Sequence, residues 1–231
     1  MFHVKHVETP ATPAIAATVF GDRLAGAIRY AELLATDGVV RGLIGPREAE
    51  RVWERHLFNS AAIGELIAND ARVVDAGSGA GLPGIPLALA RPDLRVTLVE
   101  PMQRRTAFLD EVVKALSLDA KVVRGRIEDT AVQESVGTVD VVTCRAVAGL
   151  DKLTRWCLPL LRPGGQLLAI KGERASDEVE EHRRVMKALG AGTVRVMKCG
   201  GEFLDPPTTV VVVERTPRRQ APAQARSGRR P

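Results

Sequence analysis

The sequence is poor in aromatic residues and cysteines and has no long apolar segment. Phe, Trp and Tyr make up only 3% of its 231 residues, so Val, Leu and Ala must fill the core of a chain that is 45% apolar. No apolar run reaches the roughly 18 residues that a membrane helix needs, and residues 1–7 are too polar for a signal peptide. The three cysteines, Cys144, Cys157 and Cys199, form no Cys-x-x-Cys pair. These absences predict a cytoplasmic protein without a metal site or membrane segment.

Positive charge is in excess only at one end of the chain. The formal net charge is +5, and residues 216–231 contain five arginines and no acid, which leaves residues 1–215 formally neutral. Because this tail is also rich in Pro, Gln, Ala and Ser, we expect it to be disordered. Two interpretations of the tail stay open: an electrostatic arm for nucleic acid, or a solvated and dispensable segment.

A glycine-dense turn follows the first strongly apolar run of the second part of the chain. Residues 72–74 (RVV) lead into Asp75, and an apolar, helix-like segment follows at 85–90. Between them lie four glycines within eight residues: Gly77, Gly79, Gly81 and Gly84. Glycines at a strand–turn–helix junction let the backbone approach a ligand that a Cβ would exclude. This pattern predicts the ligand-binding turn of a doubly wound α/β domain.

The turn alone is compatible with two kinds of cofactor. Its spacing satisfies the dinucleotide fingerprint, and so does Glu100 at the end of the next predicted strand. Two details argue against a dinucleotide: Asp75, whose carboxylate can bind an ammonium group or order the turn, and Pro83, which removes a donor that a pyrophosphate would need. The pattern resembles the S-adenosylmethionine site of class I methyltransferases, in which the acid after the second strand binds the ribose hydroxyls. We assign that role to Glu100.

The distribution of apolar residues predicts two parts before the tail. Residues 1–70 form a helical N-terminal extension, with a loose lead-in at 8–19, one helix from residue 20 to near Gly38, and a second from Gly45-Pro46 to Leu66. Residues 71–215 alternate between strands and helices. The predicted strands are 72–76, 95–100, 121–124, 139–144, 166–171, 194–198 and 209–214. The predicted helices are 85–90, 104–116, 130–134, 150–161 and 177–189.

The connection between the last two predicted strands decides the type of sheet. It is a short loop around Asp205-Pro206-Pro207, too short for a parallel crossover, so the last strand is expected to be antiparallel. A seven-stranded, mainly parallel sheet with a reversed last strand is typical of class I S-adenosylmethionine-dependent methyltransferases, which have a Rossmann-like α/β fold. We therefore predict this fold for residues 71–215.

Residues after the other predicted strands complete the candidate site, because ligands bind at the carboxyl ends of such strands. Ile127 and Glu128 follow the third strand and are candidates for holding adenine. Arg145 and Lys171 end the fourth and fifth strands, and two cations on one rim suit a phosphate or carboxylate. The alternative is that each of them simply pairs with an acid such as Glu173.

The second helix of the extension carries further candidates. Arg47, Arg51 and Arg55 recur every four residues, either as a phosphate-binding stripe or as partners of the glutamates between them. His56 and Asn59 lie three residues apart on one face, where a lone histidine is more often structural than catalytic.

No general base or covalent nucleophile is evident. The Asn/Asp-Pro-Pro-Tyr motif of amine methylases is replaced by Thr143-Cys144-Arg145-Ala146, and Cys144 lacks the preceding proline of cytosine C5 methylases. A nucleophile with no proton to lose, such as guanine N7, fits this absence. Its lone pair can attack the sulfonium methyl directly, so that catalysis depends on proximity and alignment.

Five segments resemble the RsmG (GidB) family of bacterial methyltransferases. They are VVDAGSGAGLPGIPLA at 73–88, WERHLFNS at 53–60, GRIED at 125–129, CRAVAGL at 144–150 and AIKGE at 169–173, in the family's order. The resemblance covers roughly residues 20–215. Glu54 and Cys144 are mild departures from the Asp and Ser of many relatives.

The resemblance implies methylation of guanine N7 in the decoding-region loop of 16S ribosomal RNA, with S-adenosylmethionine as cofactor. It also implies cofactor contacts at Gly77, Leu82, Glu100, Ile127, Glu128 and Arg145, and it supports His56, Asn59, Arg126 and Lys171 as RNA-binding or active-site residues. The combined prediction is a monomer in which Arg145 and Lys171 position the reactants. Its cofactor residues are Asp75, Gly77, Gly79, Gly81, Leu82, Glu100, Ile127, Glu128 and Arg145. Its RNA-binding residues are Arg47, Arg55, His56, Asn59, Arg126 and Lys171.

Other functions stay open at this point. They are a ribosome-assembly factor that binds S-adenosylmethionine without turnover, a methyltransferase for another RNA, a small-molecule methyltransferase, and an NAD-dependent oxidoreductase. The scarcity of aromatic residues argues against the small-molecule enzyme, which would want an aromatic lid over its substrate.

Overall fold

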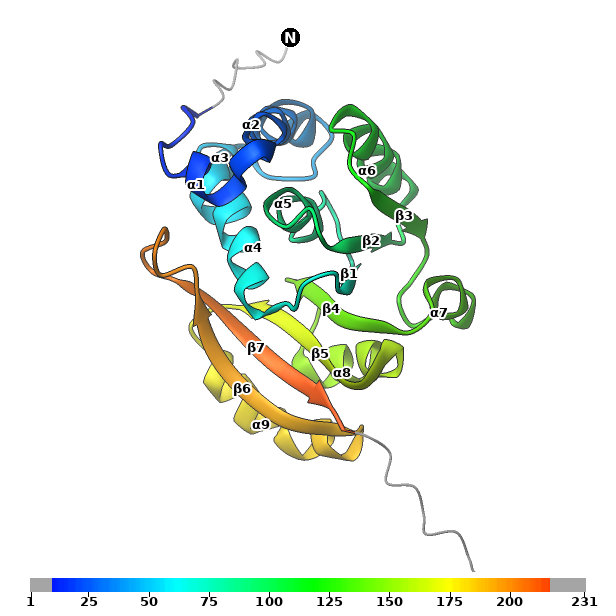
Figure 1. Cartoon of the computed structure of the whole chain (residues 1–231). Coiled ribbons are helices and arrows are strands. Elements are labelled where there is room, and N and C mark those ends of the chain that lie inside the picture. Colours follow the sequence, from blue (N-terminus) through cyan, green and yellow to red (C-terminus); the bar gives the residue numbers. More distant parts are fainter. Residues whose placement is uncertain (1–9, 217–231) are drawn as a thin grey trace, which may run out of the picture.

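A seven-stranded sheet organises the computed structural model, which describes residues 10–216 (Figure 1). The strand order is β3-β2-β1-β4-β5-β7-β6, and β7 runs antiparallel to both of its neighbours. The strands are β1 Arg72–Ala76, β2 Arg95–Glu100, β3 Ala120–Arg124, β4 Val139–Arg145, β5 Leu161–Lys171, β6 Ala191–Cys199 and β7 Thr208–Arg215. The predicted seven strands and the reversed last strand are confirmed.

Helices cover both faces of this sheet because its Val-rich strands are apolar on both sides. Val73, Val96 and Val141 face one core, and Val74, Val99 and Val142 face the other. The first core is closed by the N-terminal extension, α5 (Gly84–Ala90) and α6 (Gln103–Ala115). The second is closed by α7 (Thr130–Val136), α8 (Leu150–Cys157) with a 3-10 turn at Leu158–Leu160, and α9 (Ala175–Ala188).

The N-terminal extension is helical but less regular than predicted. It consists of α1 (Ala16–Phe20), a 3-10 turn (Gly21–Arg23), α2 (Leu24–Leu33) with a π-helical end (Leu34–Gly38), α3 (Pro46–Ala49), a π-helical segment (Val52–Phe58), α4 (Asn59–Ala61) and a 3-10 turn (Ala62–Leu66). Two expectations were wrong: the lead-in at 8–19 contains α1, and the second helix is interrupted after α3. The interruption means that Arg47, Arg51 and Arg55 do not share one regular helix face.

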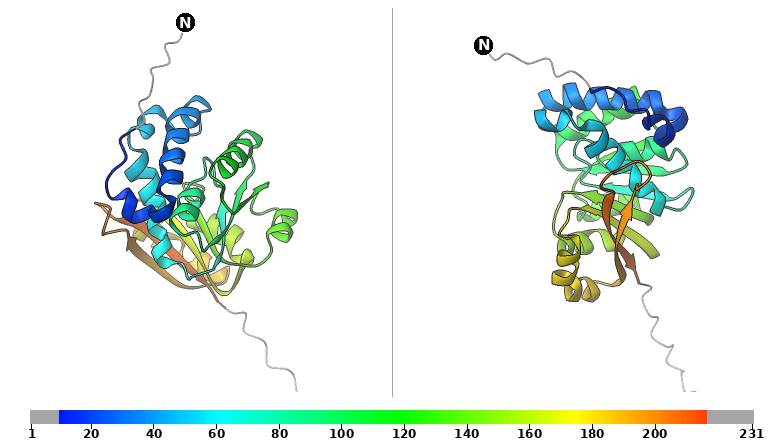
Figure 2. Two further views of the ribbon diagram at one scale, coloured as in Figure 1. Left: turned by 45° about the horizontal axis from the view of Figure 1, so that its top comes forward. Right: turned by 90° about the vertical axis from the view of Figure 1, so that its left-hand side faces the viewer.

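Four of the few aromatic residues hold the extension against the rest of the fold. Phe20, Trp53 and Phe58 have ring centroids 5.7 to 6.4 Å apart, and Phe203, from the loop between β6 and β7, lies 6.1 Å from Phe58. The apolar residues of the extension therefore belong to the same core as one face of the sheet. Figure 2 shows the extension, in blue and cyan, at one end of the molecule and α9, in gold, at the other.

A further difference concerns the start of strand β5. Strand β5 begins at Leu161, five residues before its predicted start. The prediction missed this part because Pro163 and Gly164 lie near the start of the strand, and both residue types are unusual inside strands. The predicted disordered tail lies almost wholly outside the described residues, which end at 216. None of the helices in the described part of the chain is long and apolar enough to cross a membrane.

Candidate active site

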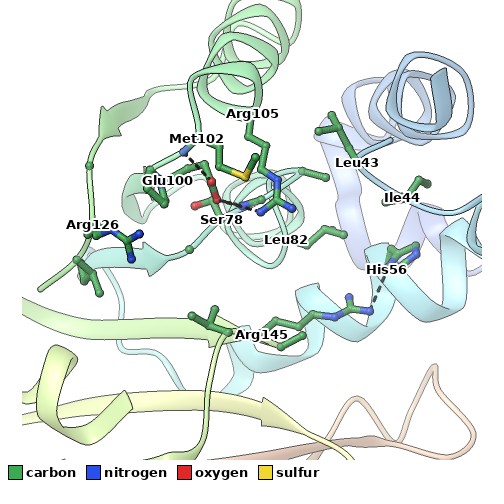
Figure 3. A pocket seen from close by; sticks show the side chains of 18 of the residues that line it. Leu43, Ile44, His56, Ser78, Leu82, Glu100, Met102, Arg105, Arg126 and Arg145 are labelled. Atoms are coloured by element: carbon green, nitrogen blue, oxygen red, sulfur yellow. Dashed lines mark hydrogen bonds and ion pairs between the residues drawn. The ribbon is translucent and has the colours of Figure 1, made fainter. Parts of the chain in front are cut away.

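A pocket of about 670 Å³ opens at the carboxyl ends of β1 to β4, where the sequence places the ligand site (Figure 3). Its walls come from the glycine turn after β1, the ends of β2, β3 and β4, and residues 43–45 of the extension. Predicted site residues that line it are Arg55, His56, Gly77, Gly79, Leu82, Glu100, Arg126, Ile127, Glu128 and Arg145. The fold thus brings together residues that are up to ninety positions apart in the chain.

Backbone conformation explains the first two glycines of the turn. Gly77 and Gly79 have φ values of +72° and +60°, which non-glycine residues adopt only with strain. A Cβ on Gly77 would lie 2.9 Å from Val147 Cγ2, so that wall has no room for a side chain. The turn is also tied to β2, because the N–H groups of Gly77 and Ser78 both donate to the carbonyl oxygen of Val99.

The donors at the start of α5 are engaged within the protein. The N–H groups of Gly81 and Leu82 donate to the carbonyl of Ser78, and that of Gly84 donates to the Asp75 carboxylate. Pro83 has no N–H group. This arrangement differs from a dinucleotide site, in which free N–H groups at the helix start receive the pyrophosphate.

Asp75 and Gly81 lie behind the wall rather than in it. The Asp75 side chain is fully buried, accepts from Gly84 N at 3.0 Å and faces Thr143 Oγ1 at 3.3 Å. Burial raises the pKa of its carboxyl to about 6, against hydrogen bonds that favour the charged form. Of the two roles considered for Asp75, ordering the turn is the one that this geometry provides.

Glu100 occupies the position expected of a ribose-binding acid. Its Oε2 accepts from Gly79 N at 3.0 Å and its Oε1 accepts from Met102 N at 3.0 Å, so the carboxylate is held rigidly at the pocket wall. Each carboxylate oxygen has a second lone pair, which leaves acceptor capacity for two hydroxyl groups of a ligand. The Arg105 guanidinium lies 3.7 Å away.

Arg145 is held by a contact with the extension. Its Nη2 lies 3.1 Å from Nδ1 of His56, whose Nε2 lies 3.2 Å from Glu48 Oε2. Because arginine can only donate, Nδ1 must accept and the histidine proton is on Nε2. Burial and the nearby arginines lower the pKa of His56 to about 3, so the ring is neutral at physiological pH. The second nitrogen of Arg145, Nη1, is buried without a hydrogen-bond partner in the described structure.

Besides Asp75 and Gly81, three predicted residues do not line the pocket. Lys171 bonds to Ala148 and Glu178 beside it, so its acidic partner is Glu178 and not Glu173. Asn59 is half-buried and its carbonyl accepts from Thr208 Oγ1. Arg47 is exposed at the start of α3.

Several lining residues were not found from the sequence. Leu43, Ile44 and Gly45 come from the loop before α3, while Met102 and Trp156 are apolar residues partly exposed at the pocket. Only the position of Met102, two residues after Glu100, offered a signal in the sequence. Cys144 is buried, and burial raises the pKa of its thiol to about 12, so it is not a thiolate nucleophile of the kind that cytosine C5 methylases use. The described residues contain no cluster of His, Cys, Asp or Glu that could hold a metal ion.

Comparison with known proteins identifies the family. The model of the GidB family, described as rRNA small subunit methyltransferase G, matches residues 23–206. The chain belongs to this family. Two similar proteins are named ribosomal RNA small subunit methyltransferase G: one from Mycolicibacterium smegmatis is 61% identical over 98% of this chain and 95% of its own length, and one from Mycobacterium marinum is 62% identical over 87% and 88%. The chain is thus a methyltransferase of the rRNA small subunit methyltransferase G family, as its sequence motifs indicated.

Solved structures support the fold. A methyltransferase from Pyrococcus furiosus aligns with 67% of this chain and 80% of its own, at a TM-score of 0.52 and 14% identity. An S-adenosylmethionine-dependent O-methyltransferase from Thermotoga maritima aligns with 71% and 66%, at a TM-score of 0.51 and 14% identity. At such identities the similarity concerns the fold alone, which is that of class I methyltransferases. Family and fold together imply the use of S-adenosylmethionine.

Proposed function

We propose that this protein transfers the methyl group of S-adenosylmethionine to N7 of a guanine in the decoding-region loop of 16S ribosomal RNA. Family membership supports ribosomal RNA of the small subunit as the substrate. The observation that supports a ring nitrogen as the acceptor is the state of His56, which lines the pocket yet has no free basic nitrogen.

The pocket residues fit this cofactor. At Gly79 an added Cβ would meet only the Gly77 carbonyl oxygen, at 3.9 Å, so this part of the turn leaves space for the methionine part, and Glu100 retains lone pairs for the ribose diol. Ile127 and Met102 are apolar residues that both line the pocket, as an adenine ring requires. Leu82, Glu128 and Arg145 complete the proposed contacts, while Asp75 and Gly81 act from behind by shaping the turn.

The bound cofactor supplies an electrophilic methyl group on a sulfonium. The protein need not remove a proton from guanine N7, since that nitrogen attacks through a lone pair. His56 could not do so in any case, because Nδ1 accepts from Arg145 and Nε2 faces Glu48. What the pocket residues provide is a fixed orientation of both reactants, which can contribute about 7–11 kcal/mol to lowering a barrier.

The cations around the pocket are proposed to bind RNA rather than to take part in methyl transfer. Positive charge passes to the purine during the reaction, so an arginine beside N7 would oppose it. Arg145, which lines the pocket, is better placed on a carbonyl or carboxylate oxygen. The side chains of Arg55 and Arg126 are 50% and 68% exposed at the rim, where they suit phosphates. Arg47, His56 and Asn59 stay predictions for the RNA side.

A methylation assay tests the proposal. Small ribosomal subunits from cells that lack this protein are incubated with the protein and labelled S-adenosylmethionine, and borohydride–aniline treatment then cleaves the RNA at N7-methylguanine. We expect one strong cut in the decoding-region loop. It should be absent with Gly77→Asp, because Gly77 has φ +72° and a Cβ there meets Val147 at 2.9 Å.

The same assay distinguishes the alternative of an assembly factor. Cofactor binding without label in subunits or naked RNA would reject the methyltransferase proposal and favour a structural use of the cofactor. Label in RNA without a borohydride–aniline cut would reject N7 as the acceptor but keep the enzyme. Incorporation into subunits and naked RNA should be compared in parallel to define the substrate.

A further inference from the structure

Lys171, at the end of β5, contacts the protein and does not point into the pocket. Its Nζ donates to the carbonyl oxygen of Ala148 at 2.9 Å and lies 2.8 Å from Glu178 Oε1. The Lys171 side chain is only 15% exposed, and that of Glu178 is 24% exposed. An ammonium group with two protein partners and so little surface is poorly suited to bind RNA phosphates.

Glu178, on α9, makes a second contact with the same oxygen. Oε1 also accepts from the N–H of Leu150 at 3.0 Å, and Leu150 is the first residue of α8. Helices α8 and α9 lie side by side on one face of the sheet (Figure 1). The ion pair therefore joins three elements: the end of β5, the first turns of α9 and the start of α8.

The segment fixed by these contacts is the loop from β4 to α8, residues 146–149. Ala146 has φ +54°, a conformation that alanine adopts only under constraint. Ala146 and Val147 both line the pocket, directly after Arg145. Val147 is 39% exposed and packs closely against Gly77. A Cβ added to Gly77 would lie 2.9 Å from Cγ2 of Val147.

We propose that Lys171 and Glu178 act together as positioning residues: the ion pair holds the β4–α8 loop in the conformation that shapes one wall of the active site. Neither side chain contacts the substrates. This inference rests on the proposed methyl transfer and deepens it, because it assigns Lys171 a role in the geometry of the pocket in place of a contact with RNA. It also assigns a role to Glu178, which no sequence motif indicated.

The two roles predict different kinetics. If Lys171 binds a phosphate, its loss should weaken RNA binding and reduce the salt dependence of kcat/KM by about one unit of slope, and loss of Glu178 should have no such effect. If the pair positions the loop, removal of either partner should lower kcat to the same degree, and the salt dependence should stay unchanged. The kcat of the double variant should then be no lower than that of the more impaired single variant.

The experiment uses the full chain and small ribosomal subunits as substrate, with active sites counted by binding of labelled S-adenosylmethionine. The variants are Lys171→Met, which keeps the apolar stem, Glu178→Ala, and both combined. Glu178→Gln is the conservative rescue, because its amide oxygen can still accept from Leu150 and Lys171. Glu180→Ala is the matched control: Glu180 lies on α9 too and pairs with Arg183 at 2.7 Å, but its side chain is 70% exposed.

We expect kcat per active site to fall about tenfold in Lys171→Met, Glu178→Ala and the double variant, with an unchanged salt slope. Glu178→Gln should stay within about threefold of the wild type, and Glu180→Ala should be indistinguishable from it. Should Lys171→Met fail to fold, Glu178→Ala and its Gln rescue decide the question by themselves.

Two results would overturn the inference while leaving the proposed function intact. One is a reduced salt slope in Lys171→Met together with normal kcat in Glu178→Ala. The other is a lower melting temperature in both variants with normal kcat per active site, which would make the pair merely structural. An inactive wild-type chain would instead refute the proposed methyl transfer, and this inference with it.

Discussion

The buried carboxyl of Asp75 should make the stability of this protein depend on pH in an unusual direction. Its folded-state pKa is about 6, against an ordinary value of 3.8, because burial disfavours the charged form. The folded chain therefore holds this proton to higher pH than the unfolded chain does. The contribution of Asp75 to the free energy of unfolding is fully present below about pH 4 and is lost as the pH rises through about 6.

The size of the effect follows from the shift. A difference of about two pKa units corresponds to a total loss of about 3 kcal/mol, of which about 2 kcal/mol falls between pH 4.5 and pH 7.5. Asp75→Asn removes the titration and keeps the geometry. Its amide oxygen can accept from Gly84 N, and its NH₂ group can donate to Thr143 Oγ1, which lies 3.3 Å from the present carboxylate.

The assay is urea unfolding of the wild type and Asp75→Asn across this pH range. The free energy of the variant minus that of the wild type should increase by about 2 kcal/mol from about pH 4.5 to pH 7.5. Asp93→Asn is the control, because the Arg91 hydrogen bond lowers the pKa of Asp93 to about 2. Its titration is nearly complete below this range, so its difference curve should be flat. A flat curve for Asp75→Asn as well would refute the assigned burial of the carboxyl.

Cofactor binding by the same variant tests the position of Asp75 behind the pocket wall. Since the side chain has no exposed surface, Asp75→Asn should change the dissociation constant for S-adenosylmethionine by less than about threefold. A loss of tenfold or more in a folded variant would show that the carboxylate reaches the ammonium group of the cofactor, as the sequence also allowed.

Two other substitutions, Gly84→Ala and Tyr30→Phe, test the packing around the glycine turn, and Gly172→Ala serves as a control. Gly84→Ala would place a Cβ 2.3 Å from Leu98 Cδ2 in the core, and we expect it to lower the free energy of unfolding in urea by about 1–3 kcal/mol. Gly172→Ala, whose Cβ would meet no heavy atom within 4 Å, should change it by less than about 1 kcal/mol. Tyr30→Phe removes the hydroxyl that donates to the Ala80 carbonyl at 2.8 Å, so stability should fall by about 1–2 kcal/mol. Titration with S-adenosylmethionine should show weaker binding by this variant, because Ala80 lines the pocket, and unchanged binding would contradict that link.

The strands of the sheet could be predicted closely because local sequence determines them. Strands β1 and β2 have the predicted limits, since each is a Val-rich run with an acid at or next to its last residue and turn residues after it. The antiparallel β7 followed from loop length alone. The extension was predicted less well, because its π-helical segments depend on packing of Trp53 and Phe58 against distant residues, which helical periodicity does not record.

Strand-end positions identified much of the site but not the direction of each side chain. Asp75 and Glu100 both end or nearly end a strand, yet Asp75 turns behind the glycine turn and Glu100 lines the pocket. For Lys171 the nearest acid in the sequence, Glu173, was the wrong partner. Glu178 is correct because the first turn of α9 brings it back over the start of α8.

The N-terminal extension is part of the active site as well as of the core. It supplies residues 43–45 of the wall and His56, which holds Arg145 at the end of β4. Through Tyr30 it also supports the glycine turn. The sheet alone would leave the Arg145 guanidinium without its nitrogen acceptor and the pocket open on that side. The boundary near residue 70, clear in the sequence pattern, therefore separates two kinds of secondary structure and does not separate two functions.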